Sequence, residues 1–250
     1  MIERPSCPVC GESRWRTIGT RGYRLSDIVS LNEYEQMRYR VLFEVWFPGQ
    51  SEIELTSRLC RECGFVTYTP RPSADDVEAK YLFLSDINNT DRSPALSTRD
   101  PERARLLYRS LRRHLPDGRR ARVLDFGGGD GRLMREFLKT MCFCYLVDYS
   151  KKACSGIERL GSTEDDIPGD VNFDLIICSH VIEHVADPLQ VLTKLKGHLN
   201  PNGAIYVELP MEIWGAAPLH NEPVTHVNFF TVGSTRRLFE RTGLVPSRAG

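Results

Sequence analysis

The stretch Asp125-Phe126-Gly127-Gly128-Gly129-Asp130-Gly131 follows a strand predicted at 122–126 and opens a helix predicted near 131–140. Glycine allows the backbone to turn tightly after a strand and to come close to a bound ligand. In open parallel sheets, ligands bind beyond the carboxyl ends of the strands. The stretch therefore predicts an α/β domain whose ligand site includes this loop.

Strands and helices alternate around this loop. The strands are predicted at 143–148, 157–162, 173–178 and 204–209, and the helices at 101–115, 187–199 and 232–242. Asp187 is the expected N-cap of the second of these helices, Gly243 is expected to end the third, and Asn200-Pro201-Asn202-Gly203 is expected to form a turn. Such alternation indicates a parallel sheet covered by helices on both faces. Because the sequence stops at residue 250, where a sixth strand would begin, we expect a sheet without its C-terminal strands.

The loop favours one adenosine cofactor over another. Asp148 ends the second predicted strand, seventeen residues after Gly131, where a carboxylate can accept hydrogen bonds from both ribose hydroxyls. The dinucleotide fingerprint Gly-x-Gly-x-x-Gly fails, because Arg132 and Met134 occupy the third glycine position in the two possible registers. Asp130 would also repel a pyrophosphate, whereas S-adenosylmethionine (SAM) has no phosphate and carries a sulfonium and an ammonium group.

The span 122–209 resembles the core of class I SAM-dependent methyltransferases. The first motif of that family, acid-x-Gly-x-Gly-x-Gly, is matched from Asp125 to Gly131. The acid that ends its second motif is matched by Asp148. The segments 173–184 and 199–203 are similar to the fourth-strand and fifth-strand regions of that family. The resemblance implies a Rossmann-like fold and a SAM site. Its expected residues are Asp125, Gly127, Gly129, Asp130, Gly131, Asp148, Thr163, Glu164 and Ser179, with Thr163, Glu164 and Asp165 all near the position of the acid that contacts adenine.

Four of the eight cysteines form two Cys-x-x-Cys-Gly pairs, and the other four fall in or beside apolar segments. The paired residues are Cys7, Cys10, Cys60 and Cys63. Four thiolates can surround a tetrahedral zinc ion and leave no open position, which predicts a structural metal, with iron as the alternative. A zinc module in front of a class I core resembles a methyltransferase subgroup that includes the sugar C-methyltransferases.

The predicted organisation has three parts. Residues 1–72 form a zinc-ribbon-like module, with strand-like stretches at 43–47 and 52–56; residues 73–120 form a helical linker, and 121–250 the SAM-binding core. A polar stretch at 85–100 is interpreted as connecting chain.

Histidines and one glutamate are the catalytic candidates. His180-Val181-Ile182-Glu183-His184 matches the inverted zinc-protease pattern His-x-x-Glu-His, but its place after a predicted strand favours the acceptor side of a methyltransferase site. His226 is the leading candidate for a general base, because imidazole titrates near neutral pH. In the resembling sugar C-methyltransferases a Tyr/Glu/His cluster occurs here. His226 matches its histidine, whereas Thr225 stands in place of the glutamate and no tyrosine precedes it.

Composition limits the partners. Lys plus Arg and Asp plus Glu both number 33, which argues against a surface built for nucleic acid or membrane. Nine arginines between 99 and 122 fit a solvated helix face better than an RNA site. The start of the sequence resembles no signal peptide, and no apolar run approaches the roughly 20 residues of a membrane span, so we expect a cytoplasmic protein.

The function predicted from the sequence is SAM-dependent methylation of a small molecule, with a sugar or nucleotide sugar as the first candidate acceptor. Two alternatives stay open. One is an RNA methyltransferase that holds RNA with the zinc module and the arginine-rich helix. The other is a non-catalytic protein that binds SAM or a partner protein.

Overall fold

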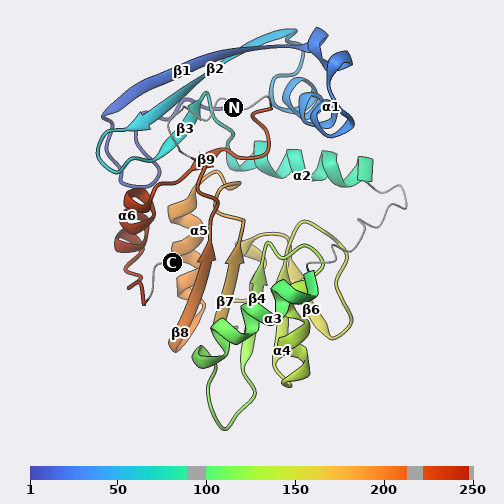
Figure 1. The fold of residues 1–250 in the computed structure, drawn as a ribbon, viewed down its shortest axis with the longest axis vertical. Coiled ribbons are helices and arrows are strands. Elements are labelled where there is room, and N and C mark those ends of the chain that lie inside the picture. The colour runs from blue at the N-terminus through green and yellow to red at the C-terminus, as the bar shows by residue number, and fades with distance from the viewer. Residues whose placement is uncertain (89–99, 213–221, 248–250) are drawn as a thin grey trace. The chain divides into compact units, whose positions relative to one another are not determined.

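The computed structural model describes residues 1–88, 100–212 and 222–247, which fold into two compact units (Figure 1). The first unit combines Met1–Ile87, Ile182–Gln190 and Leu209–Gly250, and the second combines Asn88–Val181 and Val191–Glu208. These bounds differ from the three successive segments expected from the sequence, because the first unit is assembled from separate stretches of chain. Most of the connecting stretch predicted at 85–100 lies outside the described residues.

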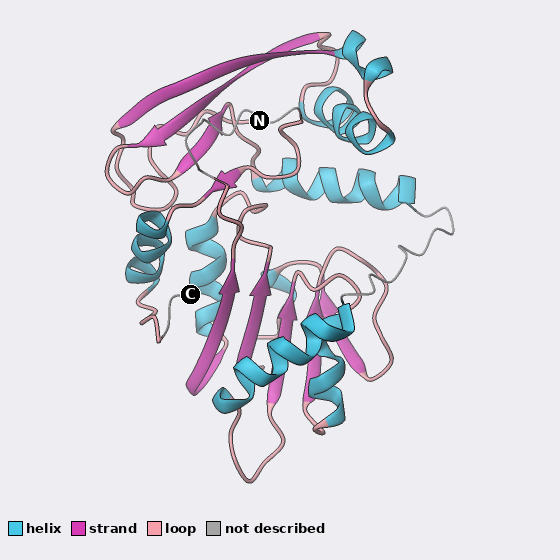
Figure 2. Ribbon diagram, in the orientation of Figure 1, coloured by secondary structure: helices cyan, strands magenta, loops and turns pink. Residues whose placement is uncertain are grey.

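The second unit is built on a parallel sheet, which confirms the predicted α/β fold (Figure 2). Its strand order is β6-β5-β4-β7-β8. The strands are β4 (Arg122–Phe126), β5 (Phe143–Val147), β6 (Ile157–Gly161), β7 (Phe173–Ser179) and β8 (Leu199–Glu208). Since β4 lies between β5 and β7, the loop after β4 stands at the middle of the edge formed by the carboxyl ends.

Helices α3 (Asp100–Leu111) and α4 (Arg135–Lys139) cover one face of this sheet. Leu107 of α3 and Phe137 of α4 pack with Val123 of β4 and Leu175 of β7 in one buried cluster. Helix α5 (Pro188–Gly197) is drawn on the other side of the sheet in Figure 1. The amide of Gln190 donates to the Asp187 carboxylate over 3.0 Å, so Asp187 caps this helix as predicted.

The turn predicted at 200–203 is part of β8. Phe173 pairs with Leu199 and Leu175 with Ala204, so the residues between Leu199 and Ala204 form a bulge in the strand. Asn202 has a φ of 65°, a left-handed conformation that is common in turns. The residues 200–203 therefore adopt a turn-like backbone, but they do so as a bulge within β8 and not as a loop before it.

The first unit contains an antiparallel sheet of order β1-β2-β3-β9. Its strands are β1 (Trp15–Arg24), β2 (Glu52–Cys60), β3 (Val66–Thr69) and β9 (Asn228–Phe229), and its helices are α1 (Glu33–Arg40), α2 (Ala74–Asn88) and α6 (Val232–Thr242). Gly243 ends α6 with a φ of 66°, as predicted. None of the helices in the described part of the chain combines the length and apolar character that crossing a membrane needs.

The prediction of a strand at 43–47 is wrong. Val41–Trp46 is a π-helix that continues α1. Val41, Leu42 and Phe43 are all buried, and three successive buried side chains do not fit a strand that alternates between two faces. They pack with Tyr23 of β1 in the core of the first unit, so tertiary packing overrides the β preference of these residues.

Candidate active site and cysteine cluster

The glycine loop joins β4 to α4 through a short 3-10 helix, Arg132–Met134. Gly127, Gly129 and Gly131 have φ values of 72°, 65° and 77°, a conformation that other residues rarely adopt. A Cβ added at Gly129 would meet no atom within 4 Å, so the loop is open at this position. The structure thus leaves room at Gly129 for a closely approaching cofactor.

Asp148 lies directly after β5 and is joined to the glycine loop. Its Oδ2 accepts a hydrogen bond from the amide of Gly129 over 2.8 Å, and its Oδ1 accepts one from the amide of Ser150 over 2.6 Å. Burial raises the pKa of this half-buried carboxyl. The structure therefore brings together the loop and the acidic residue that the sequence predicted as one site.

Asp125 and Asp130 are not placed like Asp148. Asp125 is 1% exposed, and a Cβ on Gly128 would fall 2.1 Å from its Oδ2, so its carboxyl group lies directly beneath the loop. Asp130 instead pairs with Arg132, with Oδ1 2.8 Å from Nε, which holds the pKa of Asp130 below its usual value. Arg132 also contacts Asp100.

The pKa of Asp125 predicts how stability depends on pH. Burial, with the nearby charges of Asp148 and Asp130, raises this pKa from 3.8 to about 7. The folded protein then keeps a proton that the unfolded chain releases. This protonated carboxyl contributes fully to the free energy of unfolding below pH 4. The contribution, on the order of 4 kcal/mol, is lost as pH rises towards 7. We expect Asp125→Asn to become more stable relative to wild type as pH increases from 5 to 8, measured by urea unfolding; a constant difference would contradict this assignment.

Thr163 and Glu164, predicted near adenine, lie just after β6. Thr163 begins the 3-10 helix Glu164–Asp166, and its amide donates to the Asp166 carboxylate over 2.9 Å. Glu164 Oε1 is 3.5 Å from Lys194 Nζ, and Asp165 Oδ1 is 2.6 Å from the same amine. These contacts fix the chain beyond β6 without deciding which residue would contact adenine.

Ser179 ends β7 and His180 follows it, and the sequence did not reveal the partners of either residue. Ser179 Oγ donates to Glu208 Oε2 over 2.6 Å and accepts from Arg103 Nη2 over 2.7 Å. His180 Nε2 lies 3.7 Å from Glu208 Oε1, and its φ is 57°. Arg103 and Glu208 come from α3 and β8, so their approach to Ser179 depends on the folded sheet.

In the first unit, Glu183, His184 and His226 form a compact cluster. Their ligand-type atoms all lie within 4.8 Å of one another. The ring centroids of His184 and His226 are 4.7 Å apart, and His184 Nε2 is 3.8 Å from Glu183 Oε1. The Glu183 side chain is 0% exposed. His180 belongs to the second unit, so the four predicted catalytic residues divide between the two units.

A buried polar clamp fixes the segment that carries Glu183 and His184. Asn228 Nδ2 donates to the carbonyls of Ile182 and Val185, and its amide donates to that of Glu183. Arg71 Nη2 donates to the carbonyl of Ala186 over 2.8 Å and to Asn228 Oδ1 over 2.9 Å. Since β9 contains Asn228 and pairs with β3, this clamp ties the histidine cluster to the sheet of the first unit.

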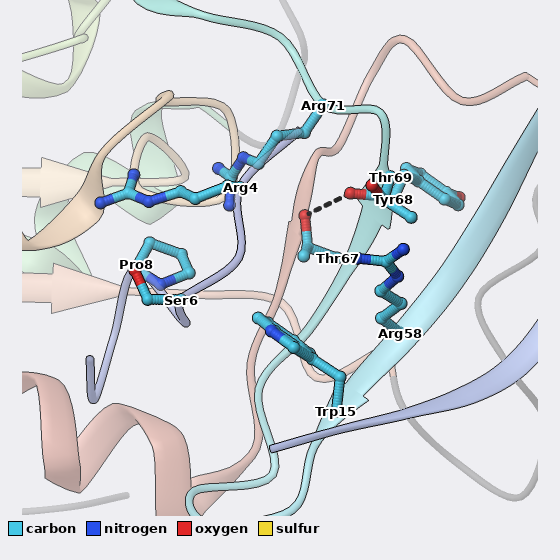
Figure 3. Close-up of a pocket in the computed structure, with 9 residues that line it drawn as sticks. All are labelled: Arg4, Ser6, Pro8, Trp15, Arg58, Thr67, Tyr68, Thr69 and Arg71. Carbon is cyan, nitrogen blue, oxygen red and sulfur yellow. Dashed lines mark hydrogen bonds between the residues drawn. The ribbon is translucent and has the colours of Figure 1, made fainter. Parts of the chain in front are cut away.

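Arg71 is only 2% exposed, and burial lowers its pKa to about 10. Its side chain borders a small pocket that is also lined by Arg4, Arg58, Thr67 and Trp15 (Figure 3). Arg4 pairs with Asp187 over 2.7 Å, and the Thr67 hydroxyl donates to the carbonyl of Val227 over 2.8 Å. The residues that line this pocket therefore also hold the segments 182–187 and 226–229 in place.

Glu212, Tyr34 and Lys80 were not found from the sequence. His226 Nδ1 is 2.8 Å from Glu212 Oε2, so a carboxylate holds this imidazole from a position that the sequence did not indicate. The hydroxyl group of Tyr34, from α1, is 2.7 Å from Thr225 Oγ1. Lys80 donates to the carbonyl of Val224 over 3.3 Å, and complete burial lowers its pKa to about 7. Of these three residues, only Glu212 is close to His226 in the sequence, and Glu212 is not part of a recognisable motif.

The four predicted cysteine ligands form a second cluster in the first unit. Cys7 and Cys63 have their sulfurs 3.8 Å apart, Cys10 and Cys60 have theirs 3.5 Å apart, and all four sulfurs lie within 4.8 Å of one another. Sulfurs bound tetrahedrally to zinc at 2.3 Å are separated by about 3.8 Å, so this set fits the ion. A hydrogen bond from Cys63 lowers the pKa of Cys7 to about 6.

The family model described as a methyltransferase domain matches residues 99–247. The chain belongs to this family. The match includes the glycine loop, Asp148 and both segments that carry the histidine cluster. The family assignment therefore agrees with the class I resemblance stated from the sequence.

Among its relatives, the chain is 27% identical over 115 residues to ubiquinone biosynthesis O-methyltransferase of Rickettsia felis, covering 42% of this chain and 47% of that one. It is 28% identical over 117 residues to the enzyme of the same name from Xanthomonas campestris, covering 41% and 47%. The matched stretch spans about half the length of these curated relatives.

A solved structure shares the fold. Burkholderia thailandensis 1,6-didemethyltoxoflavin-N1-methyltransferase, with bound 1,6-didemethyltoxoflavin and S-adenosylhomocysteine, aligns with a TM-score of 0.53 and 17% identity. The alignment covers 75% of this chain and 84% of the Burkholderia protein. At this identity the likeness establishes the Rossmann-like fold.

Proposed function

We propose that this methyltransferase transfers the methyl group of SAM to a small polar acceptor, with a sugar or nucleotide sugar as the first candidate. The observation that carries the proposal is the joining of Asp148 to the open glycine loop where β4 and β5 end. Membership in the methyltransferase-domain family supports it. The Burkholderia structure, which contains S-adenosylhomocysteine and a small-molecule substrate, is consistent with both parts of the proposal.

The residues around the loop fit an adenosine cofactor. Each Asp148 oxygen accepts one amide hydrogen bond, from Gly129 or from Ser150, and a carboxylate oxygen has a further lone pair for a ribose hydroxyl. The backbone at Gly129 has room for close approach. SAM, when bound, supplies an electrophilic methyl group. The contribution of the chain is to orient the cofactor and the acceptor, which accounts for much of the acceleration in a displacement reaction.

We assign activation of the acceptor hydroxyl or carbon to the cluster of Glu183, His184 and His226. Glu212 accepts the Nδ1 hydrogen of His226, which leaves Nε2 as the nitrogen with a free lone pair. His184 is held in the same way, because its Nδ1 donates to the carbonyl of Thr225 over 2.6 Å. This arrangement supports the sequence prediction that His226 has a chemical role.

His226→Ala is expected to lower kcat about 100-fold or more with little change in SAM affinity, because positioned acid–base groups typically contribute at least that factor. Glu212→Gln should lower kcat less, since the imidazole remains but its orientation weakens. Methyl transfer from labelled SAM to a panel of sugars, nucleotide sugars and other small alcohols provides the assay. His114→Ala, which changes a histidine of the second unit, is the matched control. Unchanged kcat in His226→Ala would remove the histidine cluster from the mechanism.

RNA is less well supported as an acceptor. Two arginines of the 99–122 region are engaged with carboxylates: Arg103 pairs with Glu208, and Arg119 pairs with Asp174. These ion pairs reduce the positive charge available to a phosphate backbone. The geometry of these arginines therefore favours a small-molecule acceptor.

We also propose that Cys7, Cys10, Cys60 and Cys63 hold a structural Zn²⁺. The sulfur separations support the proposal, and four protein ligands would leave no position for substrate. The cytoplasmic location predicted from the sequence agrees with it, because a reducing compartment keeps these thiols available for metal.

A further inference from the structure

We infer that Glu183, His184 and His226 bind a divalent transition-metal cation, separate from the zinc of the four cysteines. The ligand-type atoms of the three residues lie within 4.8 Å of one another. Two imidazoles and one carboxylate are a common ligand set for Zn²⁺, Fe²⁺ and Mn²⁺ sites that retain open positions. The site belongs entirely to the first unit, so its geometry is defined within one compact body.

The orientation of both histidines is the first argument. His184 donates its Nδ1 hydrogen to the carbonyl of Thr225, and His226 donates its Nδ1 hydrogen to the carboxylate of Glu212. Metal-binding histidines usually direct one ring nitrogen to a carbonyl or carboxylate, which fixes the tautomer and leaves the other nitrogen for the metal. Two adjacent histidines share this arrangement here, and each therefore offers Nε2.

The ligand spacing is the second argument. Two ligands bound tetrahedrally at about 2.1 Å are separated by ~3.4 Å. His184 Nε2 and Glu183 Oε1 are 3.8 Å apart, so a small side-chain rotation would bring them onto one ion. The edge-to-face packing of the two imidazoles, with centroids 4.7 Å apart, already directs both rings into the same small volume.

Charge and rigidity are the third argument. Glu183 is a fully buried acidic side chain, and a buried carboxylate is commonly paired with a cation. The backbone of Glu183 accepts hydrogen bonds from the amides of Val227 and Asn228, each 3.0 Å long. These bonds hold the 183–184 segment against the 226–228 segment, so the ligands from both segments are positioned before a cation binds.

The role of the cation rests on the proposed function. A bound cation would take the acceptor hydroxyl at an open position and lower the pKa of that hydroxyl. The acceptor O–H bond then breaks and its proton leaves to water. A C–O bond forms as the S–CH₃ bond of SAM breaks, and S-adenosylhomocysteine is released. His226 would then act on the acceptor proton through the cation that it binds, so the loss of kcat expected for His226→Ala holds in this arrangement as well.

The binding test uses Mn²⁺ added to the full chain after the cysteine cluster has been saturated with one equivalent of Zn²⁺. Imidazole and carboxylate ligands accept Mn²⁺, whereas thiolates favour Zn²⁺, so this order separates the two clusters. Electron paramagnetic resonance of free Mn²⁺ measures the bound fraction. We expect one Mn²⁺ per chain in the wild type and in the control His114→Ala. His184→Ala and His226→Ala should weaken binding at least tenfold, and Glu212→Gln should weaken it about 10-fold to 100-fold.

Circular dichroism checks that each variant is folded. Absence of Mn²⁺ binding in the wild type, or equal binding by the folded His184→Ala and His226→Ala variants, would overturn the cation site. Full methyl transfer by metal-depleted protein would overturn the catalytic role of the cation and leave the proposed methyltransferase function intact. Mn²⁺ binding that depends on His184 and His226 supports the site even if no acceptor is methylated, in which case only the proposed function fails.

Discussion

Asp148→Ala is expected to weaken SAM binding at least 100-fold. Asp148 is the carboxylate placed to accept the ribose hydroxyls, and it also holds the amide of Gly129 in the loop. A hydrogen bond to a charged group contributes about 1.5–3 kcal/mol, so losing two of them costs roughly 3 kcal/mol or more. Isothermal titration calorimetry with SAM measures this change directly, without knowledge of the acceptor.

Two further variants separate the ribose contacts from the support of the loop. Asp148→Asn retains an acceptor for the Gly129 amide but loses the charge, so we expect intermediate affinity. Asp170→Ala removes an exposed carboxylate elsewhere in the second unit and should bind SAM like the wild type. SAM affinity that is the same in Asp148→Ala and the wild type would show that Asp148 does not hold the ribose.

Cys60→Ser is expected to abolish zinc retention and to lower the stability of the first unit by at least about 5 kcal/mol. Structural zinc contributes about 10–16 kcal/mol of apparent binding free energy in small zinc-dependent peptides. The hydrophobic core of the first unit, which includes Tyr23 and Phe43, should preserve part of its structure. A loss of this size corresponds to a fall of roughly 10–20 °C in Tm for a unit of this length.

Elemental analysis and thermal unfolding in the same samples provide the measurement. Cys154→Ser is the matched control, because Cys154 is a half-buried cysteine of the second unit and is remote in sequence from both Cys-x-x-Cys pairs. Zinc should remain bound in the control, and its Tm should stay close to that of the wild type. Equal zinc content in Cys60→Ser and the wild type would show that the metal is held elsewhere.

The proximity of the glycine loop and Asp148 could be predicted because its signals are local. A strand, a glycine loop and an acid at the end of the next strand are separated by short stretches of chain. The pairing of Phe126 with Val147 places the loop beside Asp148. Parallel pairing brings the carboxyl ends of neighbouring strands to one edge, so the sequence pattern fixes both the residues and their proximity.

The histidine cluster could be predicted only in part. His184 and His226 were identified individually, but Glu212 and Tyr34 were not, because no spacing rule connects them with the histidines. Tyr34 and Thr225 are 191 positions apart. The π-helix Val41–Trp46 was missed for a related reason, since its aromatic and β-branched residues favour a strand when their packing is unknown.

The sequence by itself determined the parallel sheet, the glycine loop with Asp148, the helix caps at Asp187 and Gly243, and the four cysteines expected to bind zinc. Each of these depends on the conformational preference or chemistry of residues within one short motif, or on a pair of matching motifs. The tertiary structure alone decided that three separate stretches form the first unit and that Asn228 and Arg71 clamp the Glu183–His184 segment beside His226. Those contacts depend on which distant segments bury their polar groups together, and local backbone preferences do not specify that choice.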